Sequence, residues 1–265
     1  MLLSLMPRKW VIKTCLCLGV LLSIASYGQV NYWKIVEQCN SDIEHKFNLQ
    51  ESYQARGDAY YGLGKYEKAI RDYKSSIAEG NSSADIQYNI GICYFMLSSY
   101  DTAIKYFHTA IKNKEDLTEA YIYIAECYKR KQEPEKAIRL LKGVIKKDSL
   151  NANVSYNLGL LYREQFKYQE ALHFFALAKK DKAYKYFSLL NLVLCYSKIS
   201  DFANAENNLK EAQQLDPSNS YTILYEGILL SSKKDKQKAC NCFYIAKQKG
   251  NREADSLIKL IKCEN

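Results

Sequence analysis

Small residues, and the apolar residues that follow them, recur along this 265-residue chain at intervals of 34 positions. Glycine occupies the same register four times, at Gly57, Gly91, Gly159 and Gly227. Twelve positions later alanine occurs in every repeat, at Ala69, Ala103, Ala137, Ala171, Ala205 and Ala239. Four positions after each alanine comes an aromatic residue or leucine, at Tyr73, Phe107, Leu141, Phe175, Leu209 and Phe243. A fixed period of this length predicts an array of repeated structural units.

Each repeat contains two stretches with the spacing of an α-helix. In the first repeat, small and apolar residues recur at helical intervals from Tyr53 to Tyr60 and again from Ala69 to Ser76, with Gly64 between the two stretches. The pattern therefore predicts a pair of antiparallel helices joined by a short turn. The small residues allow the two backbones to approach closely. We expect the residue at the eleventh position, a tyrosine in the first five repeats and Leu230 in the sixth, to fill the space that they leave.

This pattern resembles the tetratricopeptide repeat family. Six units follow one another without insertion or deletion: 50–83, 84–117, 118–151, 152–185, 186–219 and 220–253. The resemblance implies an all-α fold, a right-handed superhelical solenoid of antiparallel helix pairs in which neighbouring units share a core. We expect residues 29–49 to form an N-terminal capping helix, with a degenerate seventh repeat as the alternative. Residues 254–265 are expected to form a C-terminal capping helix.

The first 28 residues have the layout of a signal peptide. Basic residues up to Lys13 precede an apolar run from Cys15 to Ala25, and small residues place a cleavage site before Gln29. The apolar run is short for a membrane-spanning helix, which needs about 20 residues. We therefore expect export to a bacterial periplasm or cell envelope, with no stable membrane insertion after cleavage. An uncleaved N-terminal anchor is the alternative.

Composition adds little to the functional picture. The net charge of +9 falls to +6 when the three basic residues of the leader are removed. The basic clusters lie near predicted turns and lack the interleaved aromatic residues of a single-strand nucleic-acid groove. Solubility is therefore the favoured explanation of the charge, and nucleic-acid binding is disfavoured.

Candidate catalytic or metal-binding chemistry is not evident. The three histidines have no cysteine or histidine at metal-ligand spacing, and the sequence contains neither a phosphate-binding loop nor a nucleophile elbow. We predict no enzymatic activity, no cofactor and no metal site. Nine cysteines are too few for a disulfide-rich scaffold. Cys93, Cys127 and Cys195 share the tenth position of their units, which predicts a buried packing role.

The resemblance also implies where a ligand would bind, because first helices line the concave face of such arrays. The usual contact positions place these candidates on that face: Asp58, Asp85, Tyr88, Ile92, Phe95, Glu126, Tyr156, Leu160, Arg163, Phe187, Leu190, Tyr221 and Leu224. The amino-terminal part is acidic, and the middle and far parts are apolar and aromatic, as at many binding sites. The alternative is that flanking helices or a tight curl bury this stripe. No unit has both the lysine at the fifth position and the asparagine at the ninth that chaperone-binding members use.

The sequence thus predicts an exported, non-enzymatic protein–protein interaction scaffold that binds a protein or peptide in the concave groove. A peptide-sensing regulatory domain is one alternative. An accessory subunit of an envelope enzyme or secretion complex is another.

Overall fold

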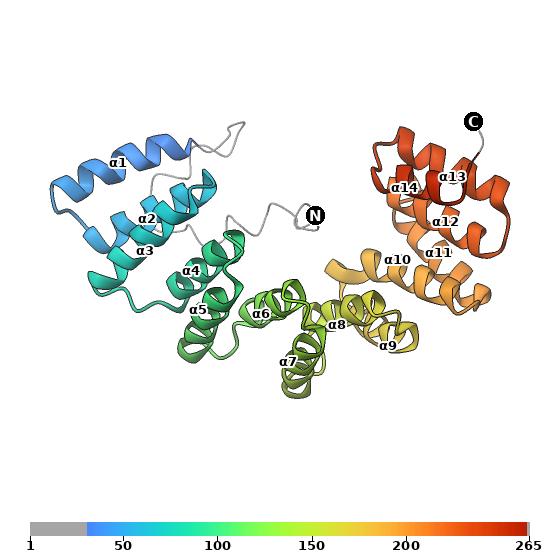
Figure 1. Ribbon diagram of the computed structural model, residues 1–265, viewed down its shortest axis with the longest axis horizontal. Helices are drawn as coiled ribbons and strands as arrows, with labels where there is room; N and C mark the ends of the chain where they lie inside the picture. The colour runs from blue at the N-terminus through green and yellow to red at the C-terminus, as the bar shows by residue number, and fades with distance from the viewer. Residues whose placement is uncertain (1–30, 264–265) are drawn as a thin grey trace. The chain divides into compact units, whose positions relative to one another are not determined.

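Fourteen α-helices and their connecting turns make up residues 31–263, the part of the chain that the computed structural model describes (Figure 1). The predicted leader, residues 1–28, lies outside these residues. The chain divides into two compact units, residues 1–81 and 82–265, and each is described by itself.

Residues 31–81, the described part of the first unit, contain three helices in chain order. They are α1 (Tyr32–Glu44), α2 (Leu49–Gly62) and α3 (Tyr66–Ala78). Helix α2 packs against both of its neighbours. The turn between α2 and α3 lies at Gly64, where the sequence predicts it.

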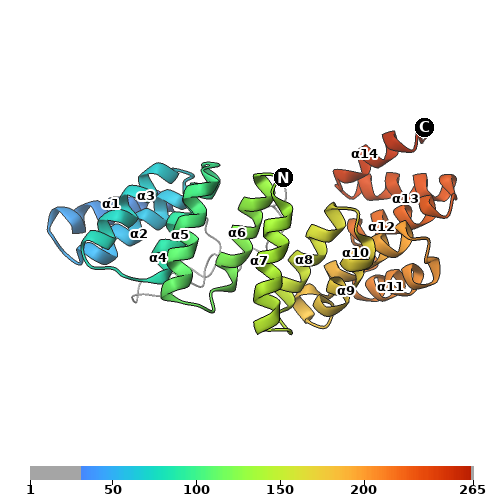
Figure 2. The same ribbon diagram turned by 60° about the horizontal axis from the view of Figure 1, so that its bottom comes forward.

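The second unit contains eleven helices that pack as consecutive pairs (Figures 1 and 2). The pairs are α4 (Ala84–Met96) with α5 (Tyr100–Asn113), α6 (Thr118–Arg130) with α7 (Pro134–Lys147), α8 (Ala152–Glu164) with α9 (Tyr168–Ala178), α10 (Lys182–Lys198) with α11 (Phe202–Leu215), and α12 (Ser220–Ser232) with α13 (Lys236–Gln248). A last helix, α14 (Glu253–Leu260), packs on α13. The all-α fold of paired helices is confirmed.

The eighth-position glycines make room for a ring of the second helix, and this corrects the prediction that the eleventh-position tyrosine fills the space. A Cβ atom added at Gly91 would lie 2.7 Å from two ring carbons of Phe107. The same relationship joins the other three glycines to the residue 16 positions later, namely Gly57 to Tyr73, Gly159 to Phe175, and Gly227 to Phe243. The glycine at the eighth position therefore leaves the space that the aromatic ring at the twenty-fourth position occupies.

The eleventh-position tyrosines pack elsewhere, against residues of the second helix that lie farther from the small positions. The ring of Tyr94 stacks on Tyr106 with centroids 5.4 Å apart, and Tyr162 stacks on Phe174 at 5.5 Å. All of the eleventh-position tyrosines except Tyr162 are only half-buried. These half-buried rings lie farther from the centre of each helix pair than the side chains of the twenty-fourth position, which are buried.

The turn inside each unit places its fifteenth residue in the left-handed backbone region. Only the first unit uses glycine there, at Gly64. The other units use Ser98, Gln132, Phe166, Ser200 and Lys234, with φ between 59° and 66°. Among these, Phe166 is also 77% exposed, so it combines an unfavourable backbone conformation with an exposed aromatic ring.

The first helix of the fifth unit begins earlier than the repeat predicts. Helix α9 ends at Ala178, and α10 begins at Lys182, four positions before the expected start of that unit. Asp181 caps the early start, because its carboxylate accepts a hydrogen bond from the backbone N–H of Ala183 at 2.8 Å. The extra turn brings Tyr184 onto the ring of Tyr156, with centroids 5.5 Å apart.

Both terminal helices keep the register of the repeat. Helix α1 begins and ends 34 positions before α3, as a second helix of a preceding unit would. Helix α14 begins 33 positions after α12, as a first helix of a following unit would. Each terminal helix is therefore half of a repeat by register.

One disulfide joins Cys240 of α13 to Cys263, which follows α14. The sequence analysis predicts no such bond. Cys263 occupies the tenth position of the incomplete last unit, and Cys240 occupies the twenty-first position of the unit before it. In the middle of the array the same two positions hold Cys195 and Leu172, which lie in one buried apolar cluster. The bond thus replaces an apolar contact between neighbouring units. The predicted burial of Cys93, Cys127 and Cys195 is confirmed.

Candidate functional site

The thirteen candidate contact residues differ widely in exposure. Four of them are buried in the helix packing: Ile92, Phe95, Leu190 and Leu224. Eight others are half-buried: Asp58, Tyr88, Glu126, Tyr156, Leu160, Arg163, Phe187 and Tyr221. Asp85, in the first turn of α4, is exposed. The role of this face in binding stays a prediction, and the half-buried members offer it the most side-chain surface.

Two of the three acidic candidates already have partners within the chain. The hydroxyl of Tyr73 donates a hydrogen bond of 2.7 Å to Asp58 in the first unit. In the second unit, the carboxylate of Glu126 accepts from Arg130 at 2.8 Å and lies 2.7 Å from the ammonium group of Lys129. The two ion pairs offset the charge of Glu126, whereas the neutral Tyr73 hydroxyl only occupies an acceptor oxygen of Asp58.

The aromatic candidates of α4 are held in an internal cluster of rings. Tyr123 of α6, which is not among the candidates, meets Tyr88 edge-on at 5.7 Å and Phe95 edge-on at 5.5 Å, and stacks on Phe107 at 5.4 Å. Burial raises the pKa of Tyr123 above its usual value. This end of the aromatic stripe therefore serves mainly to pack α4 against α6.

A different arrangement is found on the first helices α8, α10 and α12. We call Tyr156, Tyr184, Arg163, Asn191 and Tyr225 the Arg163 cluster. The guanidinium of Arg163 donates to the side-chain oxygen of Asn191. The Asn191 amide in turn donates to the backbone oxygen of Phe187 at 2.8 Å and to the Tyr156 hydroxyl at 3.4 Å. Asn191 is only 4% exposed, so these bonds fix it and, through it, the position of Arg163.

The three tyrosines of the cluster, Tyr156, Tyr184 and Tyr225, all have raised phenol pKa values. Burial raises the pKa of Tyr225 to about 12 and that of Tyr184 to about 12. The nearby positive charge of Arg163 acts in the opposite direction on Tyr225 and Tyr156, which locates both phenols in its field. The three hydroxyl groups therefore stay protonated at neutral pH and can serve as hydrogen-bond donors.

Arg163 has no carboxylate partner among the described residues. Only one other described arginine is half-buried, Arg56 of the first unit, and it forms a two-point ion pair with Asp72 at 2.7 and 2.8 Å. The hydrogen bond to Asn191 uses one of the five N–H donors of Arg163. A partly desolvated guanidinium with donors to spare is suited to bind a carboxylate from outside the chain.

Sequence reasoning includes Tyr156 and Arg163 of this cluster among the candidates but misses its other members. Asn191 and Tyr225 share the sixth position of their units, and so does Tyr123 of the ring cluster. The sixth position is therefore the signal that could have found them. Tyr184 was out of reach, because it lies on the extra turn of α10.

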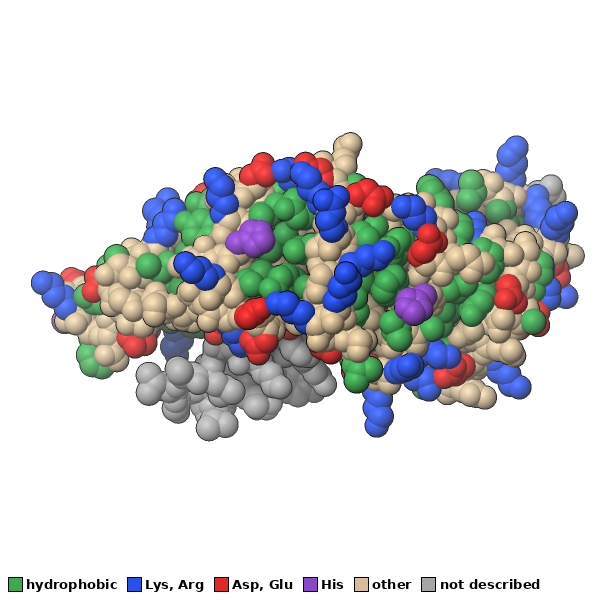
Figure 3. Space-filling view, turned by 90° about the horizontal axis from the view of Figure 1, so that it is seen from below, with side chains coloured by type: hydrophobic (Ala, Val, Ile, Leu, Met, Phe, Trp, Pro, Cys, Tyr) green, Lys and Arg blue, Asp and Glu red, His purple; other side chains and the backbone are tan. Residues whose placement is uncertain are grey.

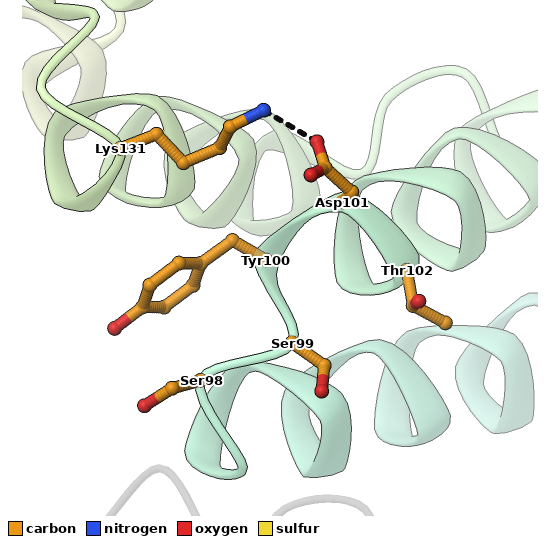
Figure 4. A pocket seen from close by; sticks show the side chains of 6 residues that line it. All are labelled: Ser98, Ser99, Tyr100, Asp101, Thr102 and Lys131. Carbon is orange, nitrogen blue, oxygen red and sulfur yellow. Dashed lines mark hydrogen bonds and ion pairs between the residues drawn. The ribbon is translucent and has the colours of Figure 1, made fainter.

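Two hollows of the surface are lined by residues outside the Arg163 cluster. One of about 300 Å³ is lined by Ser98, Ser99, Tyr100, Asp101, Thr102 and Lys131 (Figure 4). The only cation in its lining, Lys131, points to Asp101 and pairs with it. A second hollow, of about 240 Å³, lies between the loop before α8 and the loop before α10. Neither hollow contains any of the candidate residues.

In residues 31–263, no group of three or more histidine, cysteine or acidic side chains could hold a metal ion. None of the helices in that range has the length and apolar character needed to cross a membrane. On the face shown in Figure 3, lysine and arginine side chains are spread among acidic and apolar ones.

Comparison with known proteins decides the family. Tetratricopeptide repeat models match residues 55–117 and 188–219, and a model for subunit 3 of the anaphase-promoting complex, or cyclosome, matches residues 96–178. The chain is a tetratricopeptide repeat protein. Its helix pairs, with a period of 34 and small residues at fixed positions, are the units of that family.

Solved structures show the same fold at low sequence identity. The C-terminal part of a tetratricopeptide repeat protein from Cytophaga hutchinsonii is 19% identical, with a TM-score of 0.66 over 85% of this chain and 94% of that one. A chain of the anaphase-promoting complex assembly Cut9–Hcn1 is 15% identical, with a TM-score of 0.63 over 87% of this chain. The present chain spans only 46% of that protein's length. YrrB, described as a tetratricopeptide repeat protein with an unusual peptide-binding site, is 17% identical, with a TM-score of 0.51 over 71% of this chain and 97% of that one. No curated protein matches the sequence.

Proposed function

We propose that this chain is an exported scaffold that holds a segment of a partner protein along α8, α10 and α12, with a carboxylate of that segment bound to Arg163. Tetratricopeptide repeat proteins bind protein partners, so a protein ligand follows from the family. The acidic character of the ligand and its place on the array are inferred from this chain's own side chains.

The observation that carries the proposal is the half-buried Arg163 guanidinium, which forms no ion pair with any residue that the structure describes. Holding a partly desolvated cation costs free energy unless a counter-charge approaches it. Asn191 orients the group, and the rings of Tyr156, Tyr184 and Tyr225 supply apolar contact area together with hydroxyl donors. Aromatic and arginine side chains of this kind supply most of the binding energy at many interfaces. YrrB offers a precedent for peptide binding on this fold.

Photo-crosslinking in the native cell tests the location of the ligand. A photoreactive phenylalanine derivative replaces Phe187, which is half-buried beside Asn191. The matched control carries the same group at His108, an exposed residue of α5. We expect a discrete crosslinked partner from position 187 that is absent from position 108. Identical crosslinked products from both positions would contradict the assignment of ligand binding to this face.

A double-mutant cycle on the crosslinked segment tests the chemistry. The segment is synthesised with each carboxylate in turn replaced by the amide, and its dissociation constant is measured with the wild-type protein and with Arg163→Met. We expect about a tenfold loss from either change alone and little further loss from both together, as for one charge-assisted contact. Additive losses for every carboxylate would contradict the pairing with Arg163.

Export is supported by two separate features of the chain. The first 28 residues have the composition of a signal peptide, and disulfides such as Cys240–Cys263 persist mainly in oxidising compartments. Mass spectrometry of the protein from its native cell should find a mature N-terminus at Gln29 and two cysteines protected from alkylation. An intact Met1 with every cysteine alkylated would overturn export.

A further inference from the structure

Helices α1 and α14, the first and last that the structure describes, are complementary halves of a repeat by register. Helix α1 has the register of a second helix, and α14 has the register of a first helix. Every interior first helix packs on the second helix that follows it. Within residues 31–263, α14 has no such following helix, and α1 has no preceding one.

The exposure of α14 shows what its missing neighbour would cover. The seventh position of the first helix is almost fully buried in the interior units, at Ile90, Ile124, Leu158 and Leu192. Leu158, for example, lies in one buried cluster with Ala171 and Phe175 of the second helix that follows it. The seventh-position residue of α14 is Leu260, which is 74% exposed. Leu260 thus occupies a position that belongs to the core in the interior units, but no described helix covers it.

Helix α1 shows the corresponding gap on its own side. The twentieth-position alanine is 0% exposed in all six complete units. The residue in that register on α1 is Ile35, which is only half-buried. Asp42, in register with the small residue at the twenty-seventh position, is also half-buried. The face of α1 that a first helix would cover is therefore partly open.

The sizes of the residues at the two ends also match. In four of the six complete units a glycine at the eighth position meets an aromatic ring at the twenty-fourth, and in the other two the larger Ala125 and Val193 each share a buried cluster with a leucine, Leu141 and Leu209. Helix α14 is followed by isoleucine at the eighth position, Ile261, and α1 has cysteine at the twenty-fourth, Cys39. The combination of a large residue from the first helix with a small residue from the second keeps the shared volume filled.

We propose that α14 of one molecule packs against α1 of a second copy of this chain, so that the two half-repeats form one complete unit and molecules associate head to tail. The contact joins two different surfaces, so each added copy presents another free end and the assembly is open. This proposal is independent of any ligand on the Arg163 cluster.

Sedimentation velocity of the purified protein, in the processed form that the cell produces, tests the association. We expect the weight-average mass to rise at least twofold from micromolar to hundred-micromolar concentration and to pass the mass of a dimer. A constant monomer mass would overturn the proposal. That result is also the one expected if residues preceding α1 in the same chain cover its open face. A closed dimer that ignores substitutions at both ends would overturn it too.

Complementation between two blocked ends gives the sharper readout. Leu260→Glu blocks the α14 end, and Ile35→Glu blocks the α1 end. Each variant alone should stay monomeric, whereas an equimolar mixture should form a dimer and go no further, because one intact interface is left. Dimer formation in the mixture also shows that both variants are folded. Failure of the mixture to associate, when both variants have wild-type circular dichroism, would count against the proposal.

Phe166→Glu is the matched control, since it replaces an equally exposed apolar residue away from either end. This variant should associate as the wild type does. If it loses association to the same extent as Leu260→Glu, the contact is non-specific and the proposed pairing of ends is wrong.

Discussion

Gly159 of α8 lies directly against the ring of Phe175 of α9: a Cβ atom at position 159 would be 2.7 Å from two carbons of that ring. The contact explains why the eighth and twenty-fourth positions vary together along the chain. Units with glycine carry an aromatic ring, and units with alanine or valine carry leucine. The pair therefore sets the distance between the two helices of a unit.

Gly159→Ala should destabilise the protein by about 1–3 kcal/mol, because the added methyl group forces the buried Phe175 ring to shift within a packed core. Guanidinium unfolding followed by circular dichroism measures the change. Combining it with Phe175→Leu should recover part of the loss, since the double variant reproduces the pair found at Ala125 and Leu141. A double variant less stable than either single variant would show that the pair is not the determining contact.

Gly143→Ala is the control for intrinsic helix propensity. Gly143 lies in α7, and an added Cβ there would meet no atom within 4 Å. The substitution should stabilise the protein by about 0.5–1 kcal/mol, because alanine loses less conformational entropy in a helix than glycine does. Destabilisation by Gly159→Ala together with stabilisation by Gly143→Ala would separate the effect of packing from that of helix propensity.

The period of 34 was sufficient to predict the helix pairs, because every unit keeps its small residues at the same positions. It did not show which large residue fills the space beside them. Each of the eleventh and twenty-fourth positions is aromatic in most units. Only the direction of its side chain shows which of the two fills the space. The early start of α10 was also beyond the pattern, since it depends on local capping by Asp181.

The candidate site was predicted less completely. Helical register included Tyr156 and Arg163 among the candidates, but it cannot tell how deeply a residue is packed, so Phe95 and Leu224 were included although they are buried. Asn191 belongs to the Arg163 cluster through its bonds to Arg163 and Tyr156, which join separate units. Bonds of this kind join residues far apart in sequence, so only the shared sixth position, and no local motif, points to Asn191.

Loss of the Cys240–Cys263 disulfide should destabilise the C-terminal end selectively. The bond closes a loop with a sequence separation of 23, for which chain entropy predicts about 3 kcal/mol of stabilisation. Cys263→Ser should therefore increase amide hydrogen exchange in α13 and α14 and leave α4 and α5 unchanged. Cys242→Ser, on the same helix but outside the disulfide, is the control. Equal exchange in both variants would show that the bond adds no stability.

Stability should decline at alkaline pH because of the buried thiols. Burial raises the pKa of Cys127 and of Cys195 from 9.0 to about 12 in the folded protein. Between these values the folded state binds more protons than the unfolded state, so the thiols' contribution is complete below pH 9 and is lost as the pH rises toward 12. Urea midpoints across this range measure the effect. The Cys127→Ala/Cys195→Ala variant should show a shallower decline, and an unchanged slope would assign the decline to other groups.

Asp72→Asn should strongly destabilise the first unit, although it replaces only one carboxylate oxygen by an amide nitrogen. The Asp72 carboxylate is buried beside Arg56, their side chains being 8% and 18% exposed, and Arg56 also donates to Asn40 of α1 at 2.7 Å. Neutralising Asp72 leaves the guanidinium without a counter-charge, and we expect a loss of about 2–3 kcal/mol, below the range for fully buried pairs because Arg56 keeps some contact with water. Faster hydrogen exchange in α1–α3 measures this loss of stability.

Glu115→Gln is the contrasting variant, since Glu115 and Lys147 form an equally short ion pair with side chains 76% and 72% exposed. Solvent screens that pair, so its removal should leave exchange unchanged. Equal effects of the two variants would mean that burial does not decide the strength of ion pairs in this chain.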